Sequence, residues 1–335
     1  MVNSQSDNYR TPLRALAEIR GLPIGTAVDL AALASEPEYR EVLHKEFNMC
    51  VAENAFKPHL VWTGPYEYAF DSLDHLADFA RQNGMILRGH TLLWHQAVPD
   101  WLRAGNYPPH AVREMLQAYI QTIVTRYRGR IGQWDVVNEA VAEGGEGLRE
   151  TSFWHTAFGP DYIRSAFLWA GAADPDARLY YNEYGAEDMG PKADSVYTLV
   201  KSLKSEGVPI HGVGLQCHFE LGWRLTDDFQ ANIRRLEALG LDWQVTECDI
   251  RMRLDGAAPT PAQLAEQASG YGDLVRFCLD EAQCRGFVFW GFTDRHSWIP
   301  GFRPGWGAAL PLDADYRPKP AYETIAAALW KGSPV

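Results

Sequence analysis

Eight short β-rich runs alternate with eight helical patterns along the chain, and this alternation limits the fold more than any other feature of the sequence. Most of the β-rich runs are continuous apolar stretches, which is typical of strands buried on both faces. The β-rich runs cover residues 23–29, 47–53, 85–94, 133–138, 178–184, 212–218, 242–247 and 285–292. The helical patterns cover residues 37–47, 71–82, 110–128, 161–173, 193–205, 227–239, 260–282 and 320–330.

Strands and helices that alternate in this way favour a parallel (β/α)₈, or TIM, barrel of the α/β class. A doubly wound open sheet would give the same alternation, but its usual G-x-G-x-x-G turn after the first strand is absent, and Gly25 stands alone in that run. We find no internal repeat and no linker of low complexity. We therefore expect one domain over residues 1–335, with its core at about 23–331.

The charge balance limits the partners. The 31 Lys and Arg residues against 43 Asp and Glu residues give a net charge of −12. Nucleic acids and anionic membranes both require a basic surface, so we expect neither as a main partner. No stretch of 18 apolar residues occurs, and we expect no membrane-spanning helix.

The N-terminus and the cysteines bear on the compartment. The first ten residues lack the basic and then apolar pattern of a signal peptide. The protein is expected to be secreted if a leader was removed from this chain, and cytoplasmic otherwise. Cys50, Cys217 and Cys248 lie in apolar runs and are expected to be buried thiols, whereas Cys278 and Cys284 would pair only in an oxidising compartment. We expect a monomer.

Polar side chains gather where the β-rich runs end, which in a barrel is the catalytic face. Glu, His, Gln and Trp are not typical turn formers, so we interpret these ends as one shared site and not as ordinary loop starts. The residues are Asp29, Glu53, Asn54, His90, Trp94, His95, Asn138, Glu139, Asn182, Glu183, Tyr184, Gln216, His218, Glu247, Asp249, Trp290 and Asp294.

Two carboxylates stand out among them. Glu139 ends the run I-G-Q-W-D-V-V-N-E and Glu247 ends L-D-W-Q-V-T-E. Two carboxylates across a barrel mouth suit glycoside hydrolysis, in which one protonates the leaving oxygen and the other acts at the anomeric carbon. The alternative is that each is a structural ion-pair partner. His218 and Asp249 favour the first interpretation, because a protonated histidine between two carboxylates would hold Glu247 ionised and oriented.

Other chemistries lack their motifs. There is no H-x-H, H-E-x-x-H or C-x-x-C for a metal, no G-x-S-x-G for a serine nucleophile and no Walker loop for phosphates. Lys57 lies past a strand end and not inside the barrel, which disfavours a Schiff base. We therefore expect neither a metal nor a cofactor. Trp298 lies in a loop rich in Pro, Gly and charge, where it would suit a sugar-stacking surface.

Eight short motifs occur along the chain: E-N-A-F-K at Glu53, R-G-H-T-L-L-W-H at Arg88, W-D-V-V-N-E at Trp134, G-P-D-Y-I at Gly159, L-Y-Y-N-E-Y at Leu179, G-V-G-L-Q-C-H at Gly212, V-T-E-C-D-I at Val245 and W-G-F-T-D-R-H-S-W at Trp290. From Gly25 to Lys319 the chain resembles glycoside hydrolase family 10, the (β/α)₈ endo-1,4-β-xylanases. The motifs occur in the order of that family.

The resemblance implies a retaining enzyme that cleaves xylan and xylo-oligosaccharides, with Glu139 as general acid/base and Glu247 as nucleophile. It implies that His218 and Asp249 support the nucleophile, and that Asn138 bonds the sugar 2-hydroxyl. The substrate-binding residues that it implies are Glu53, Asn54, Lys57, His90, Trp94, His95, Tyr184, Gln216, Trp290 and Trp298.

The chain also departs from the family pattern. Pro58 and Ala97 replace a common Trp and Gln, residues 182–185 read N-E-Y-G instead of N-D-Y-N, and the last loop is lengthened around Trp306. These departures leave the preferred chain length and branch tolerance open. Two alternatives remain: an intracellular relative that trims short xylo-oligosaccharides, and a carbohydrate-binding barrel without activity.

Overall fold

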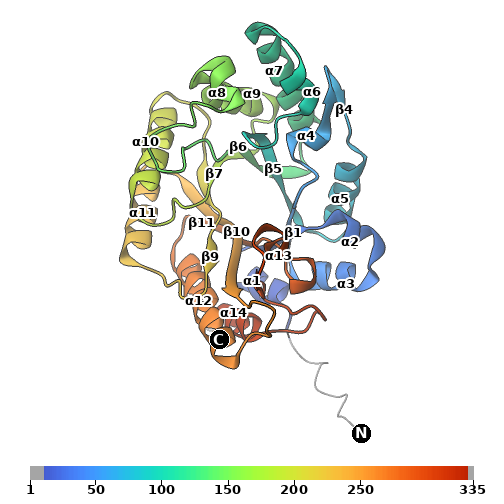
Figure 1. The fold of residues 1–335 in the computed structure, drawn as a ribbon, viewed down its shortest axis with the longest axis vertical. Helices are drawn as coiled ribbons and strands as arrows, with labels where there is room; N and C mark the ends of the chain where they lie inside the picture. The colour runs from blue at the N-terminus through green and yellow to red at the C-terminus, as the bar shows by residue number, and fades with distance from the viewer. Residues whose placement is uncertain (1–10, 331–335) are drawn as a thin grey trace.

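The computed structural model describes residues 11–330, so the N-terminal segment considered above lies outside the described residues. Eight parallel strands form a closed barrel at the centre of the molecule (Figure 1). They pair in the order β11-β1-β2-β5-β6-β7-β8-β10, and β10 pairs with β11 to close the ring. These strands are β1 (Ile24–Val28), β2 (Met49–Ala52), β5 (Ile86–Trp94), β6 (Ile131–Asn138), β7 (Arg178–Glu183), β8 (Gly212–Leu215), β10 (Asp242–Arg253) and β11 (Cys284–Phe289).

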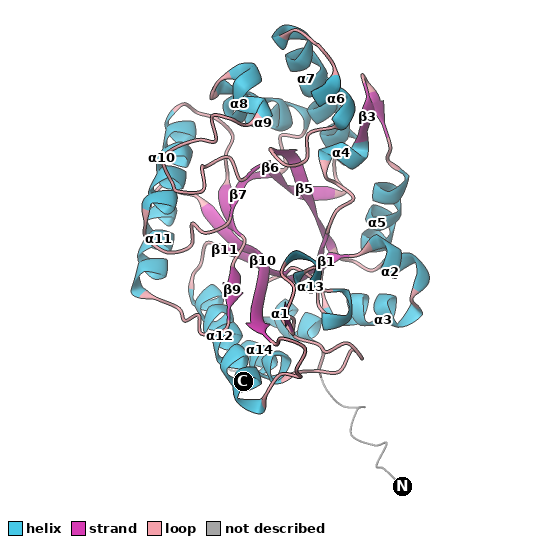
Figure 2. Cartoon of the chain, viewed as in Figure 1, coloured by secondary structure: helices cyan, strands magenta, loops and turns pink. Residues whose placement is uncertain are grey.

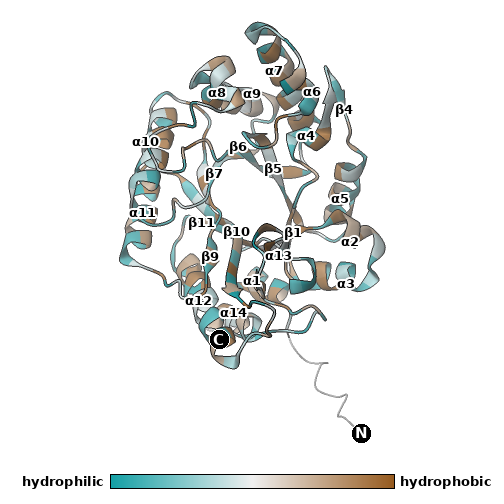
Figure 3. Cartoon of the chain, in the orientation of Figure 1, coloured by the Kyte–Doolittle hydropathy of each residue, from teal (hydrophilic) through white to brown (hydrophobic). Residues whose placement is uncertain are grey.

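Helices surround the strands as an outer ring (Figure 2). The ring helices carry both hydrophobic and hydrophilic residues (Figure 3), and their buried residues recur at helical spacing, as Met115, Tyr119 and Ile123 do in α7. The barrel predicted from the sequence is confirmed. The helices that correspond to the predicted ones are α3 (Pro37–Glu46), α5 (Asp71–Gln82), α7 (Pro109–Arg126), α9 (Asp161–Ala173), α10 (Pro191–Ser205), α11 (Asp227–Glu237), α12 (Pro261–Asp280) and α14 (Pro320–Trp330).

Short elements that the sequence patterns did not predict elaborate the connections. Helix α1 precedes the expected start of the core, yet it buries Leu13, Leu16 and Ala17. The short elements are α1 (Leu13–Arg20), α2 (Leu30–Ser35), α4 (Pro58–Val61), β3 (Trp62–Gly64), β4 (Glu67–Tyr68), α6 (Asp100–Ala104), α8 (Phe153–Phe158), β9 (His218–Glu220), η1 (Asp294–His296), α13 (Ile299–Phe302) and β12 (Trp306–Gly307).

Most strand ends differ from the prediction by one to three residues, and two runs near the site differ in their pairing. The run predicted at 212–218 is broken, because β8 ends at Leu215 and Cys217 has a φ of 59° before β9 begins at His218. The run predicted at 242–247 is longer, because β10 continues to Arg253 through pairing with β9 and β12. Trp306 of the lengthened last loop belongs to this pairing, and its ring lies 4.1 Å from the Arg303 guanidinium carbon.

The barrel strands are buried along most of their length, as predicted. Close approach between β5 and β6 requires a glycine at position 89, since a Cβ there would lie 2.1 Å from Cε3 of Trp134. All five cysteines are buried and free, so Cys278 and Cys284 do not form a disulfide. None of the described helices is both long and apolar enough to span a membrane.

Candidate active site

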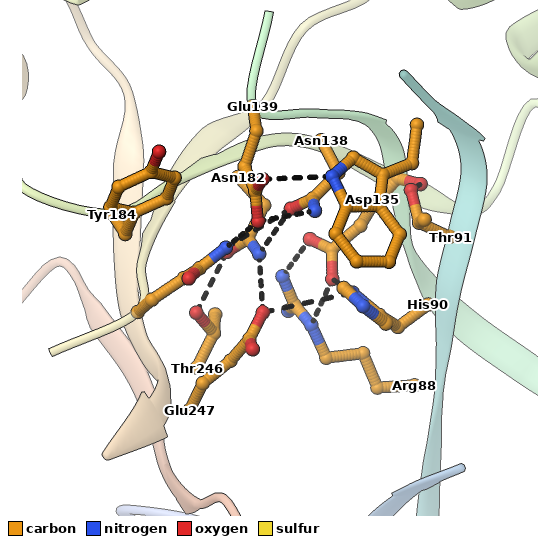
Figure 4. A network of polar contacts seen from close by, with 12 residues as sticks. Arg88, His90, Thr91, Asp135, Asn138, Glu139, Asn182, Tyr184, Thr246 and Glu247 are labelled. Atoms are coloured by element: carbon orange, nitrogen blue, oxygen red, sulfur yellow. Dashed lines mark hydrogen bonds and ion pairs between the residues drawn. The ribbon is translucent and has the colours of Figure 1, made fainter. Parts of the chain in front are cut away.

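Glu139 follows the last residue of β6 and is buried at the end of the barrel. One carboxylate oxygen accepts hydrogen bonds from Gln216 Nε2 at 2.9 Å and Asn138 Nδ2 at 3.0 Å, and the other accepts one from Trp94 Nε1 at 2.8 Å. Figure 4 shows the Glu139 side chain inside this network. Its backbone has a φ of 57°, a left-handed conformation that costs a non-glycine residue roughly 1–2 kcal/mol. The fold therefore holds this side chain in one place at a cost in backbone strain.

Glu247 lies within β10, not at the end of the strand as the sequence suggested. Its Oε1 accepts a hydrogen bond of 2.7 Å from Asn182 Nδ2, and its Oε2 lies 3.4 Å from His218 Nε2. His90 Nδ1 lies 3.9 Å from Oε1. Burial raises the pKa of Glu247, but the charges of His90 and His218 and the hydrogen bond from His218 outweigh it and leave the pKa below its ordinary value. Glu247 is therefore held as an anion.

His218 lies between two carboxylates, as the sequence predicted. Its Nδ1 is 2.9 Å from Asp249 Oδ2. Burial lowers the pKa of His218, but the charge of Asp249 and the hydrogen bonds to Asp249 and Glu247 raise it to about 10. The histidine is thus protonated near neutral pH. Trp298 Nε1 donates to the same Asp249 oxygen at 2.8 Å, and its ring is half-buried against Ile299 and Leu310. Trp298 therefore packs partly against apolar side chains of its own loop region.

An amide pair connects the two carboxylates. Asn182 Nδ2 donates to Glu247 and also to Asn138 Oδ1 at 2.8 Å, while Asn138 donates to Glu139. Thr246 Oγ1 donates to Asn182 Oδ1 at 2.7 Å and so fixes which atom of the amide faces Glu247 (Figure 4). The sequence places Asn182 at the end of an apolar run but does not indicate its function. An amide at such a position is the only sequence signal for it.

Arg88 and Asp135 form a buried ion pair next to the two carboxylates. Neither residue was predicted from the sequence to belong to the site. Asp135 Oδ2 accepts from Arg88 Nε at 3.1 Å and lies 3.0 Å from His90 Nδ1. Burial raises the pKa of Asp135, but the charges of Arg88 and His90 and their hydrogen bonds leave it lowered. The signal for both residues was a charged side chain inside a run that is otherwise apolar.

Lys57 and Asn54, which were predicted to bind substrate, lie near Trp94. Lys57 Nζ donates to Asn54 Oδ1 at 2.7 Å and lies 5.1 Å from the centre of the Trp94 ring. Burial lowers the pKa of Lys57, and the charges of Glu247, Glu53 and Glu139 oppose it. Burial and the charge of Asp29 raise the pKa of Glu53. Trp290 packs its ring edge to face with His90, at 5.2 Å between centroids.

Two more predicted residues, His95 and Tyr184, lie near Glu139. Burial and the charges of Arg149 and Lys192 lower the pKa of His95 to about 4, so its ring is neutral at pH 7. Tyr184 Oη accepts from Arg149 Nη2 at 2.9 Å and donates to Glu143. Contacts of this kind connect, in one cluster, all fifteen residues to which the family resemblance gives a role in catalysis, in support of the nucleophile or in substrate binding. Among residues 11–330, no group of three or more His, Cys, Asp or Glu side chains is arranged to hold a metal ion.

Comparison with known proteins identifies the family. The model of glycosyl hydrolase family 10 matches residues 12–328. The chain belongs to glycosyl hydrolase family 10.

Its similarity to individual family 10 proteins covers almost the whole chain. It is 39% identical to endo-1,4-beta-xylanase B of Thermotoga neapolitana over 94% of this chain and 90% of that protein. It is 37% identical to endo-1,4-beta-xylanase A of Phanerodontia chrysosporium over 94% of this chain and 76% of that protein. The crystal structure of xylanase 10B from Thermotoga petrophila with xylobiose has a TM-score of 0.92 and 38% identity, and covers 96% of this chain and 98% of that one.

Proposed function

We propose that this chain is a retaining endo-1,4-β-xylanase in which Glu139 is the general acid/base and Glu247 is the nucleophile. The observation that carries the assignment of the two carboxylates is the difference between their surroundings. Glu247 faces the protonated His218 at 3.4 Å and has a lowered pKa, whereas all three side-chain partners of Glu139 are uncharged. A nucleophile benefits from a stable negative charge, and a general acid must be able to hold a proton.

The first half of the reaction forms a covalent intermediate. The Glu247 carboxylate attacks the anomeric carbon of the bound xylose, and the bond from that carbon to the leaving oxygen breaks. Glu139 gives its proton to that oxygen, so the departing chain leaves as a neutral alcohol. Asn182, which donates to Glu247 Oε1 at 2.7 Å, keeps the carboxylate facing the sugar.

The second half returns the enzyme to its starting state. Glu139, now ionised, removes a proton from a water molecule, and that water attacks the anomeric carbon. The bond to Glu247 breaks and the xylose leaves with the β configuration it had in the substrate. Two inversions at one carbon give net retention.

We also propose that xylan and xylo-oligosaccharides are the substrates. The relatives are named for xylan cleavage, and one solved relative holds xylobiose, which supports xylan and xylo-oligosaccharides as substrates here. The half-buried rings of Trp94 and Trp298, next to the carboxylates, support stacking against sugar rings. We propose that residues 1–335 form one catalytic domain that works as a monomer.

Product analysis tests this function. The enzyme is expected to release a ladder of xylo-oligosaccharides from linear xylan, with the β-anomer formed first and the α-anomer appearing only through mutarotation. Proton NMR during the first minutes of hydrolysis measures both anomers. Initial formation of the α-anomer would contradict retention. Cleavage of xylotriose with intact polymeric xylan would favour the oligosaccharide-trimming alternative.

The charge of His218 gives a prediction about pH. Because His218 helps to lower the pKa of Glu247, His218→Asn should raise that pKa, and Glu247 would then take up its proton at a higher pH. The acid limb of kcat/KM against pH is expected to move to higher pH, measured with a dinitrophenyl β-xylobioside. The exposed His110→Asn serves as the control. An unchanged acid limb in His218→Asn would mean that His218 does not tune the nucleophile.

A further inference from the structure

Three buried side chains, Tyr181, Glu183 and Lys192, support the turn that carries Glu139. None of them is among the predicted substrate-binding residues. Tyr181 Oη accepts hydrogen bonds from the backbone N–H groups of Ala140 at 3.0 Å and Val141 at 3.2 Å. The same hydroxyl donates to Glu183 Oε2 at 2.5 Å, and Val141 N–H lies 3.3 Å from that oxygen. The two residues after Glu139 are thus held by a phenol whose one proton is committed to a carboxylate.

Glu183 is fully buried and has one close cationic partner. Lys192 Nζ lies 3.2 Å from Glu183 Oε1, and both side chains are almost completely shielded from solvent. Burial raises the pKa of Glu183 to about 7, against the charge of Lys192 and the hydrogen bond from Tyr181. A buried carboxylate without such a partner would take up a proton, so Lys192 keeps Glu183 available as an acceptor for Tyr181.

Lys192 also contacts Tyr184, one of the predicted substrate-binding residues. Its Nζ lies 3.4 Å from the centre of the Tyr184 ring, which is the geometry of a cation–π contact. Tyr184 lies next to Glu183 in the chain, and its hydroxyl is held by Glu143 and Arg149. The ammonium group of Lys192 therefore contacts both Glu183 and the ring of Tyr184.

We infer that Tyr181 and Glu183, with Lys192 as counter-ion, are positioning residues that fix the turn at residues 139–141 and so aim the Glu139 carboxyl at the leaving oxygen. The inference rests on the proposed function. The strained backbone of Glu139, with its φ of 57°, needs such support, because a left-handed glutamate persists only where its surroundings hold it. The same turn is also held by bonds from Glu139 N–H to Asn182 O at 2.9 Å, from Arg149 Nε to Glu139 O at 3.0 Å and from Arg149 N–H to Ala140 O at 2.8 Å.

Tyr181→Phe tests the hydrogen-bond part of the inference. It keeps the ring and removes all three bonds of the hydroxyl. For xylan, kcat/KM is expected to fall about 10²-fold, the cost of a misplaced catalytic group. For a dinitrophenyl β-xylobioside, whose leaving group needs no proton, kcat/KM should stay within about threefold. The control is Tyr127→Phe, which also removes a hydroxyl bonded to a carboxylate, that of Asp74 at 3.0 Å, but at the C-terminal end of the outer helix α7.

Glu183→Gln tests the acceptor of the Tyr181 proton and decides the matter if Tyr181→Phe does not fold. It keeps the size of the side chain but removes the negative charge that accepts from Tyr181 and pairs with Lys192. As for Tyr181→Phe, kcat/KM is expected to fall about 10²-fold on xylan and to stay within about threefold on the dinitrophenyl β-xylobioside. Glu237→Gln, which removes a carboxylate that accepts from Trp243 Nε1 at 3.0 Å, should leave both rates unchanged.

A purely structural function would lower the rates on both substrates together, in proportion to the loss of melting temperature, and this result would overturn the inference. Wild-type protein without xylanase activity would count against the proposed function instead.

Discussion

Glu247→Ala is expected to lower the hydrolysis of xylan by on the order of 10⁴-fold or more, because every substrate must pass through the covalent intermediate that this carboxylate forms. The loss should be equally deep for a dinitrophenyl β-xylobioside, since a good leaving group does not replace the nucleophile. The measurement is kcat/KM on both substrates. The exposed Glu38→Ala in α3 provides a carboxylate-to-alanine control.

The side chains around Glu247 act as its hydrogen-bond partners and supports. Asn182 and His218 are hydrogen-bond donors to it, and Asp249 is occupied by His218 and Trp298. The variant should remain folded by circular dichroism, although His218 would lose one of its two carboxylate partners. A folded variant that keeps more than about one per cent of wild-type activity on both substrates would contradict the nucleophile assignment.

Glu139→Ala is expected to separate substrates by their leaving groups. General acid catalysis contributes about 10²–10⁴-fold, so kcat/KM on xylan should fall by that factor. For the dinitrophenyl substrate, kcat/KM should change little, because the phenolate leaves without a proton. Its kcat should still fall, since water must attack the intermediate without a general base. Steady-state kinetics on the two substrates measure both effects.

The same split cannot arise from a general loss of structure. Removal of Glu139 frees Trp94, Gln216 and Asn138, whose side chains all donate to it. If this only loosened the site, both substrates would lose kcat/KM together. Equal losses in a variant with an unchanged melting temperature would show that Glu139 is not the general acid.

The barrel could be predicted because its signals are local. Each strand is a short apolar run and each ring helix has helical spacing, and these periods survive in a single sequence. The polar ends of the strands likewise pointed to one face, since parallel strands in a barrel end on the same side. The break at Cys217 and the extension of β10 to Arg253 depend on pairing between distant segments, which a local pattern does not contain.

The supporting residues were harder to predict for a related reason. Arg88 and Asp135 lie within apolar runs and contact each other from the neighbouring strands β5 and β6. Lys192 is the second residue of α10, in a G-P-K sequence that matches no motif, yet it contacts Glu183 of β7 inside the protein. Their importance comes from the partner that folding brings to each. Glu139, Glu247 and His218 could be named in advance because their residue types carry chemistry on their own.

A mechanism-based label tests the central claim most directly. A 2-fluoro xylobioside with a good leaving group forms the covalent intermediate but slows its hydrolysis, so the enzyme should gain the mass of one fluorinated xylobiosyl group. Peptide mass spectrometry is expected to find that group on Glu247 alone. A label on Glu139 or on any other residue, or inactivation without a covalent adduct, would contradict the assignment of Glu247 as the nucleophile.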